Sequence, residues 1–198
     1  MTTTSHTPTQ LLEPAPPHPQ TARQLLQAAA RAAEHRNTLM LSQYTLAEDG
    51  AARASRHADY AAAAALRLAI GALGRWPDRT LVGPAAARAA TQIAVRSDHL
   101  PGLQATALRL LLTATQTGTA PTAHWARLAD RCAVGAGSPQ DHGTQYLLDG
   151  TGLHLLPVTD PADELDARRA EVGLPPASCA EAALLQAFPP PAPQPPRA

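Results

Sequence analysis

Hydrophobic residues recur every three or four positions along most of the chain, which is the spacing of one apolar face of an α-helix. This pattern predicts helices over residues 21–36, 37–48, 51–76 and 84–97, and two further helices that begin near Pro101 and Pro121. Asp49-Gly50 is expected to end the second of these helices and Pro77 the third, while Pro84 suits the first turn of the fourth.

The pattern changes in the C-terminal third, where two short apolar runs flank a turn. The runs cover residues 144–148 and 153–158, and the Asp-Gly pair between them predicts a β-hairpin. A charged helix over 162–172 and a short helix over 178–187 should follow. We therefore expect a mainly α fold, a helical bundle of about five to seven helices with one small C-terminal β-hairpin near residues 144–158.

Proline-rich stretches bound this expected domain on both sides. Residues 1–20 are rich in threonine and proline, and residues 188–198 are more than half proline. Neither stretch has enough apolar residues to offset the entropy lost on ordering, so both are expected to be disordered tails. A chain of 198 residues fits one domain, which we assign to residues 21–187.

The charge balance argues against a nucleic-acid partner. The chain has 16 basic residues, all of them arginine, and 16 acidic residues, so its net charge is zero, and no basic cluster stands out. A protein that neutralises phosphates needs such a cluster, and six aromatic residues leave few platforms for stacked bases. We therefore expect no nucleic-acid partner.

The sequence also predicts a soluble protein in a reducing compartment. The longest apolar run, near residues 61–65, is mostly alanine and too short to cross a bilayer. The first 20 residues lack the charged start and apolar block of a secretory signal. We expect a cytoplasmic location, no membrane partner, and free thiols at Cys132 and Cys179, with a single disulfide as the alternative.

Motifs for metals, nucleotides and serine nucleophiles are absent from the sequence. The histidines are scattered without the i, i+4 spacing of a zinc helix, and Gly135-Ala136-Gly137 lacks the lysine of a phosphate loop. No serine lies in a Gly-x-Ser-x-Gly turn. We expect neither a metal nor a cofactor.

Polar residues are concentrated where the last long helix passes through a glycine-rich turn into the hairpin, over residues 128–145. Gln140 and Gln145 either bind a planar ligand or lock the turn onto the hairpin, because an amide both donates and accepts hydrogen bonds. Asp130 and Arg131 suit ion pairs at a helix end as well as ligand binding.

Two further candidates lie at the start of the leucine-rich helix. Asp98 is either an N-cap or a ligand-binding or catalytic carboxylate. Gln104, one turn inside that helix, is placed to hydrogen-bond back to the preceding loop.

His142 is the candidate for acid–base chemistry. Its unperturbed pKa lies near neutrality, and a catalytic role requires a nearby carboxylate. The sequence offers Asp98, Asp130 and Asp141 as that carboxylate. Packing is the alternative role for the His142 ring.

Taken together, several of these pieces resemble an uncharacterised bacterial family, domain of unknown function 6624, over roughly residues 58–176. The pieces are Trp76-Pro77 with Leu81-Val82-Gly83; Asp98, Pro101 and Gln104; Asp130-Arg131, Val134, Gly137, Pro139-Gln140 and Gly143-Thr144-Gln145; and Pro157-Val158, Asp160-Pro161, Asp166, Arg168-Arg169 and Gly173-Leu174-Pro175. The Pro-Gln-x-x-Gly-Thr-Gln core followed by a charged helix is the most specific of them.

The chain also departs from the pattern of this family. Val95 and Arg96 stand where such sequences carry a Gln-His pair, and Ala136 stands where they carry a glutamate. An aromatic residue is usual at the position of His142, which favours a packing role there. If the missing His and Glu act in relatives, this chain has lost or changed that chemistry.

From these observations we expect a polar groove beside the hairpin that binds a small molecule or a peptide. Its expected residues are Arg96, Asp98, Gln104, Asp130, Arg131, Gln140, His142 and Gln145, of which His142 and Asp98 are the catalytic candidates. The sequence is compatible with an enzyme and with a degenerate enzyme. The alternative function is that of a non-catalytic adaptor or regulatory protein, which binds a protein partner through an exposed apolar helix face.

Overall fold

Helices make up most of the structure, a computed structural model that describes residues 15–42, 48–149, 152–159 and 161–187. The elements in order are α1 (Pro19–Ser42), α2 (Glu48–Leu73), α3 (Arg79–Val95), α4 (Pro101–Gln116), α5 (Thr122–Gly135), β1 (Tyr146–Asp149), β2 (Gly152–Leu155), a 3₁₀ turn (Ala162–Glu164), α6 (Leu165–Glu171) and α7 (Ala177–Ala187). The expected mainly α fold with one C-terminal hairpin is confirmed.

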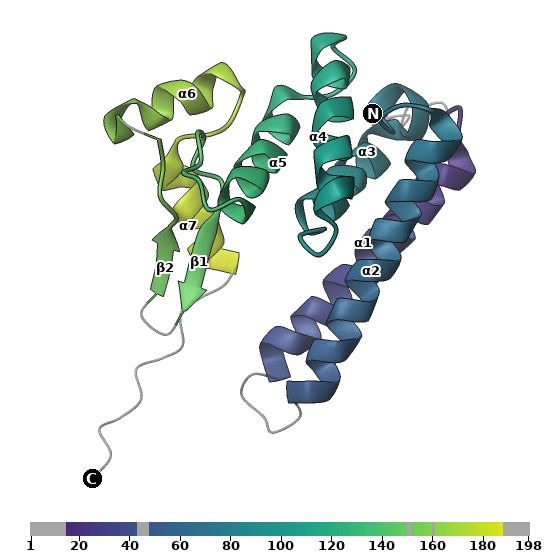
Figure 1. Cartoon of the computed structure of the whole chain (residues 1–198), viewed down its shortest axis with the longest axis horizontal. Helices are drawn as coiled ribbons and strands as arrows, with labels where there is room; N and C mark the ends of the chain where they lie inside the picture. The colour runs from purple at the N-terminus through teal and green to yellow at the C-terminus, as the bar shows by residue number, and fades with distance from the viewer. Residues whose placement is uncertain (1–14, 43–47, 150–151, 160, 188–198) are drawn as a thin grey trace, which may run out of the picture.

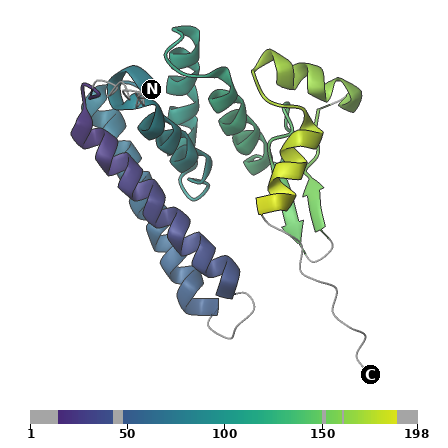
Figure 2. The ribbon, with the colours of Figure 1, turned by 180° about the vertical axis from the view of Figure 1, so that it is seen from behind.

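The elements lie in three groups side by side (Figure 1). The antiparallel helices α1 and α2 form a long arm on one side, and α3, α4 and α5 occupy the middle. The hairpin β1–β2, α6 and α7 form the other side, and both views show α7 against one face of the hairpin (Figures 1 and 2).

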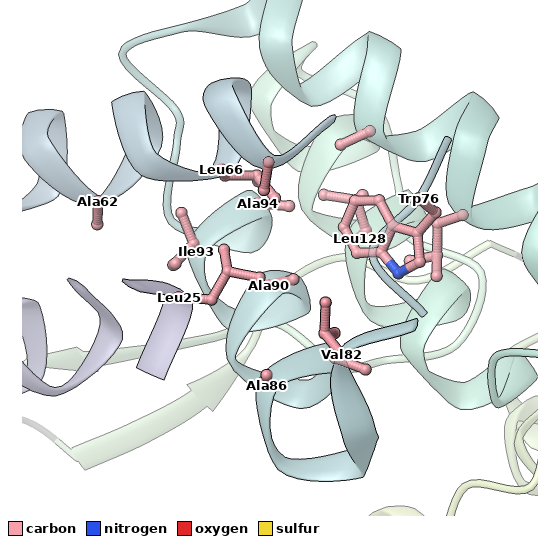
Figure 3. Packing of buried hydrophobic residues seen from close by; sticks show 14 of the residues in the cluster. Leu25, Ala62, Leu66, Trp76, Val82, Ala86, Ala90, Ile93, Ala94 and Leu128 are labelled. Carbon is pink, nitrogen blue, oxygen red and sulfur yellow. The ribbon is translucent and has the colours of Figure 1, made fainter. Parts of the chain in front are cut away.

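Alanine and a few large side chains build the core where α1, α2 and α3 meet. Leu25, Leu66 and Ile93 come from these three helices and meet in the middle of the cluster, with Trp76 at one end (Figure 3). Much of the remaining core is alanine, including Ala62, Ala90 and Ala94. Small side chains let helix backbones approach closely, so the alanine-rich sequence of α2 is a packing feature as well as a helix former.

The predicted boundaries of the first two helices were wrong. The segment 37–42 continues α1 instead of starting a new helix, and Asp49-Gly50 lies in the first turn of α2 instead of ending a helix. Glycine is tolerated in a first turn because the N–H groups there have no intrahelical partners. α2 ends at Leu73, before the predicted stop at Pro77, because Gly74 adopts φ 66° and terminates the helix.

α3 begins five residues before the predicted start at Pro84. Asp78 caps it, since its carboxylate accepts a hydrogen bond from the Thr80 N–H at 2.9 Å. Gly83, with φ 80° and ψ 162°, then kinks the helix, and Pro84 opens its regular part. Pro84 therefore follows the kink, as its missing N–H and fixed φ allow.

The predicted hairpin is present, and its antiparallel strands place Tyr146 opposite Leu155 and Leu148 opposite Leu153. Positions 150–151 of its turn lie outside the described residues. So do residues 1–14 and 188–198, which hold most of the two predicted tails. Residues 15–18 belong to the described chain, and the His18 N–H donates to the Leu81 carbonyl at 3.0 Å.

Both cysteines are free thiols, as expected. Within the described ranges, no helix combines the length and the hydropathy that a membrane span requires.

Candidate functional site

The candidate residues fall into two polar clusters, each of which includes one side chain of α5. Asp130, Gln140, His142 and Gln145 lie in the first, which we call the hairpin network and which also includes Thr144, Arg168 and Arg169. Asp98, Gln104 and Arg131 lie in the second, the corner cluster, at the junction of α3 and α4. Arg96 lies beside this second cluster, near Arg36 and Asp59.

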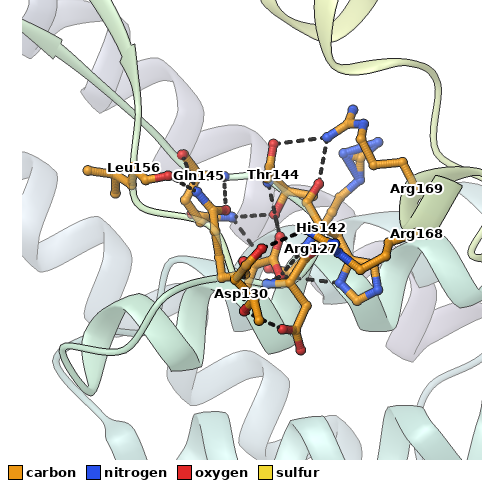
Figure 4. A network of polar contacts seen from close by, with 12 residues as sticks. Arg127, Asp130, His142, Thr144, Gln145, Leu156, Arg168 and Arg169 are labelled. Carbon is orange, nitrogen blue, oxygen red and sulfur yellow. Dashed lines mark hydrogen bonds and ion pairs between the residues drawn. The ribbon is translucent and has the colours of Figure 1, made fainter. Parts of the chain in front are cut away.

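Asp130 organises the loop that leads into the hairpin (Figure 4). Its carboxylate accepts hydrogen bonds from the backbone N–H groups of Asp141, His142 and Thr144 at 3.0–3.1 Å, and from the Thr144 hydroxyl at 2.8 Å. Burial would raise the pKa of Asp130, but the hydrogen bonds from His142 and Thr144 outweigh it, so this pKa lies below its ordinary value. Asp130 is therefore an ionised anchor of the loop.

Arg169 binds the same loop from its carbonyl side. Its Nη1 donates to the carbonyls of His142 and Gly143 at 2.7 and 2.9 Å, and its Nε donates to the Pro175 carbonyl at 2.7 Å. The side chain is 1% exposed. The loop peptides thus point their N–H groups at a carboxylate and their carbonyls at a guanidinium, and this arrangement fixes the loop electrostatically.

Gln140 joins the two ends of the hairpin. Its Nε2 donates to the carbonyls of Gln145 and Leu156 at 2.9 and 3.0 Å, and its Oε1 accepts from the Gln145 N–H at 2.8 Å. The Gln145 amide donates to the Thr144 hydroxyl at 2.9 Å and to the Arg127 carbonyl at 3.4 Å. The contacts of Gln140 are those of a side chain that locks the turn onto the hairpin, whereas the Gln145 amide contacts its neighbour Thr144 and α5.

His142 is held between Asp130 and Trp125. Its Nδ1 lies 3.3 Å from a carboxylate oxygen of Asp130, and its ring meets the Trp125 ring edge to face at 6.0 Å between centroids. The expected carboxylate partner is therefore Asp130, and not Asp98. A carboxylate at Nδ1 favours the tautomer in which Nε2 is unprotonated, as a base requires. The ring is also largely buried, as a packing role requires. This geometry combines packing with the orientation that a base would need.

The corner cluster joins α3, α4 and α5. Asp98 forms a two-point ion pair with Arg131, including a 2.8 Å bond from Arg131 Nε, and it accepts a hydrogen bond from Gln104 Nε2 at 3.1 Å. Burial would raise the pKa of Asp98, but the hydrogen bond and charge of Arg131 outweigh it and lower this pKa. The N-cap interpretation of Asp98 was wrong, because Leu100 occupies the cap position of α4.

Gln104 does reach back to the preceding loop, as expected. Besides Asp98, its amide donates to the carbonyls of Ala94 and Val95 at 3.1 and 3.3 Å. These carbonyls end α3, and the Ala94 carbonyl also accepts from the Ser97 N–H at 3.2 Å. Gln104 thereby ties α4 to the end of α3.

Arg96 lines a hollow between α1, α2 and α3, together with Arg36, Asp59, Gln92 and an apolar floor that includes Ile93. Arg36 Nη1 binds the Asp59 carboxylate at 2.8 Å. The Arg96 guanidinium has no hydrogen-bond acceptor among the described residues. Burial lowers the pKa of the Arg96 guanidinium, and the charges of Arg36 and Arg131 lower it further. The charge of Asp59 raises it.

Several residues of these clusters were not among the sequence candidates. Arg36 and Asp59 lie 23 residues apart on different helices, and no motif connects them. Arg168 and Arg169 could have been chosen from the sequence, because this pair in a short charged helix is among the residues by which the chain resembles the family. Arg168 binds the carbonyls of Asp141, Thr159 and Pro161 at 2.9–3.0 Å.

A family model described as a family of unknown function (DUF6624) matches residues 41–188, about three quarters of the chain. No curated protein and no solved structure matches the chain. In the part of the chain that the structure describes, no group of three or more His, Cys, Asp or Glu side chains is arranged to hold a metal ion.

Proposed function

The chain belongs to the DUF6624 family, whose function is unknown, and we propose from its geometry that the protein binds a small molecule or a peptide at the mouth of the hollow beside the corner cluster. The hollow itself holds only about 20 Å³, so the ligand places one polar group there and lies mostly outside it. The observation that carries this proposal is Arg96. A guanidinium offers five N–H donors, and this one is exposed at the edge of the hollow without an acceptor among the described residues. Such a group is available to a ligand.

The hairpin network is a poorer candidate because its polar groups bind one another. The Asp130 carboxylate and the Gln140 amide are each used by three or more hydrogen bonds to the loop or the hairpin. A ligand at these groups would have to replace internal hydrogen bonds, which costs free energy. The proposed site therefore lies on the α1–α2–α3 side, with Arg96 as the main contact.

A thermal-shift screen of small molecules and short peptides tests this proposal. Compounds that occupy the hollow should raise the Tm of the wild type, since ligand binding to the folded state stabilises it. The same compounds should lose most of their effect on Arg96→Gln and keep it on Arg67→Gln, a matched control at an exposed position of α2. If every stabilising compound acts equally on Arg96→Gln, the proposal is wrong.

Protein binding is a second candidate function, and an exposed groove along α1 and α2 favours it. Alanines from both helices form its floor, among them Ala28, Ala58 and Ala61, and Leu68 beside them is 73% exposed. Arg31 lies on its rim, and none of the described residues that line it is acidic. Grooves that bind a helix have an apolar floor of this kind, so the expected partner is an amphipathic helix with acidic flanks.

Site-specific crosslinking tests this second function. A photoreactive amino acid at Ala61 should capture a partner in cells, and a synthetic helix from that partner should bind the purified wild type. Ala61→Arg should abolish binding because it fills the groove, whereas Ala105→Arg, at an exposed position of α4, should not. A peptide that binds both variants equally would rule out the groove.

A further inference from the structure

We propose that the ligand of this hollow is an anion, whose carboxylate or phosphate oxygens bind between Arg36 and Arg96 and replace Asp59 as the partner of Arg36. The inference rests on the proposed function, and it names the chemical class of the ligand. It also assigns Asp59 the role of a built-in counter-ion that the ligand displaces.

The charged groups of the hollow favour an anion. Two guanidinium groups and one carboxylate line the hollow, so its charged groups carry a net charge of +1. The neighbouring Arg131 is already neutralised by Asp98 through two hydrogen bonds. An incoming anion would thus meet an excess of positive charge, and the remaining lining, which includes Gln92 and Ile93, adds no opposing charge.

Arg96 also supplies hydrogen-bond donors. Its exposed guanidinium has no acceptor among the described residues. An arginine binds carboxylate and phosphate oxygens with two parallel hydrogen bonds, a geometry that a neutral ligand rarely offers. Arg96 is therefore better suited to an anionic group than to a neutral one.

Asp59 is a partner of Arg36 that a ligand can replace. It binds Arg36 through one 2.8 Å contact, and the side chains of the pair are 22% and 23% exposed. A single-point pair in contact with water is weak, in contrast to the two-point pair of Asp98 and Arg131. A ligand anion that binds both Arg36 and Arg96 has two cationic partners, whereas the close contact of Asp59 is with Arg36 alone.

Anion titrations of three variants test the inference, with inorganic phosphate and succinate as probes. Affinity is taken from the dependence of Tm on anion concentration, at an ionic strength held constant with NaCl. At least one probe should bind the wild type, and Arg96→Gln should weaken it by about tenfold or more. Asp59→Asn should tighten it by about threefold, because the competing carboxylate is gone. Arg67→Gln should leave it unchanged.

The comparison of the two probes tells which anionic group is preferred. Binding of either probe with this order of affinities supports the inference. Absence of binding by both probes, or binding that Asp59→Asn weakens or Arg96→Gln leaves unchanged, overturns it. Circular dichroism of each variant checks that its helix content is unchanged.

The same data separate this inference from the proposed function. If neutral compounds from the screen require Arg96 while phosphate and succinate do not bind, the hollow is a binding site but its ligand is not an anion. If no compound and neither anion depends on Arg96, both proposals are wrong.

Discussion

At the scale of single residues, one loop is held by opposite charges on its two sides. Asp130 takes the N–H groups of residues 141, 142 and 144, while Arg169 takes the carbonyls of residues 142 and 143. Both side chains are 1% exposed. Removing one of them leaves buried polar groups unpaired, which costs more than a lost surface contact.

Asp130→Asn should lower the free energy of unfolding by about 2–4 kcal/mol, because the loop N–H groups lose a charged acceptor and Arg169 stays buried. Urea unfolding followed by circular dichroism measures this change. Asp163→Asn, at an exposed position, is the control and should change stability by less than about 0.5 kcal/mol. Equal stabilities of the two variants would contradict the anchoring role of Asp130.

Gly143 has a second, steric role in the same loop. Its φ is 58°, and a Cβ at this position would lie 3.1 Å from the Leu165 side chain. Gly143→Ala should therefore destabilise the protein, by about 1–3 kcal/mol. Gly71→Ala should instead stabilise it by about 0.5–1 kcal/mol, since Gly71 lies in α2 with free space around it. Thermal unfolding of both variants tests the pair, and a stable Gly143→Ala would show that the loop is not constrained.

At the scale of elements, the hairpin has little core of its own. Leu147, Leu148 and Leu155 are 37–50% exposed, and a two-stranded sheet is marginal without further support. The support comes from Gln140, whose buried amide binds Gln145 and Leu156 beside the direct hydrogen bond of 3.2 Å from the Leu156 N–H to the Gln145 carbonyl. A polar side chain thus adds hydrogen bonds at the open end of the hairpin.

Gln140→Leu keeps the side-chain volume but removes these three hydrogen bonds. The Leu156 carbonyl and the Gln145 N–H would lose their partners, while the Gln145 carbonyl would keep the Leu156 N–H, so the free energy of unfolding should fall by about 2–4 kcal/mol. Hydrogen exchange should become faster in residues 145–156 and stay slow in α2 and α3. Uniformly faster exchange would mean that the hairpin and the helices unfold as one unit.

At the scale of the whole molecule, three carboxylates hold the junctions between elements. Asp78 caps α3 and binds Arg75 in the turn after α2, Asp98 binds Arg131 of α5, and Asp130 holds the hairpin loop. Burial opposes ionisation of each, yet hydrogen bonds, and for Asp78 and Asp98 also a neighbouring arginine, keep their pKa values below the ordinary value. Ionised Asp78, Asp98 and Asp130 therefore help to hold these junctions together.

The protein should lose stability in acid as these groups take up protons. The unfolded chain binds protons at each aspartate near pH 3.9, while the folded chain binds them only at lower pH. The free energy of unfolding should thus be constant near neutrality with respect to these groups and fall below about pH 5. Urea titrations between pH 7 and pH 3 measure the fall, which should be shallower in Asp130→Asn. An equal slope in both proteins would exclude Asp130 from the effect.

The sequence by itself determined the local elements. Helical spacing of apolar residues and the Asp-Gly signal gave the helices and the hairpin, because both depend on contacts between near neighbours. The predictions at Asp49-Gly50 and Pro84 were wrong because local rules do not separate two possibilities. Glycine and proline are tolerated in the first turn of a helix as well as at a helix boundary.

Only the tertiary structure decided how the polar residues are grouped. Asp130 and Arg131 are adjacent in the sequence, yet one anchors the hairpin loop and the other binds Asp98, because neighbouring side chains on a helix point about 100° apart. The pairing of Arg36 with Asp59 and the place of Arg96 beside them depend on how α1, α2 and α3 pack. Such contacts join residues far apart in the chain, so no local pattern records them.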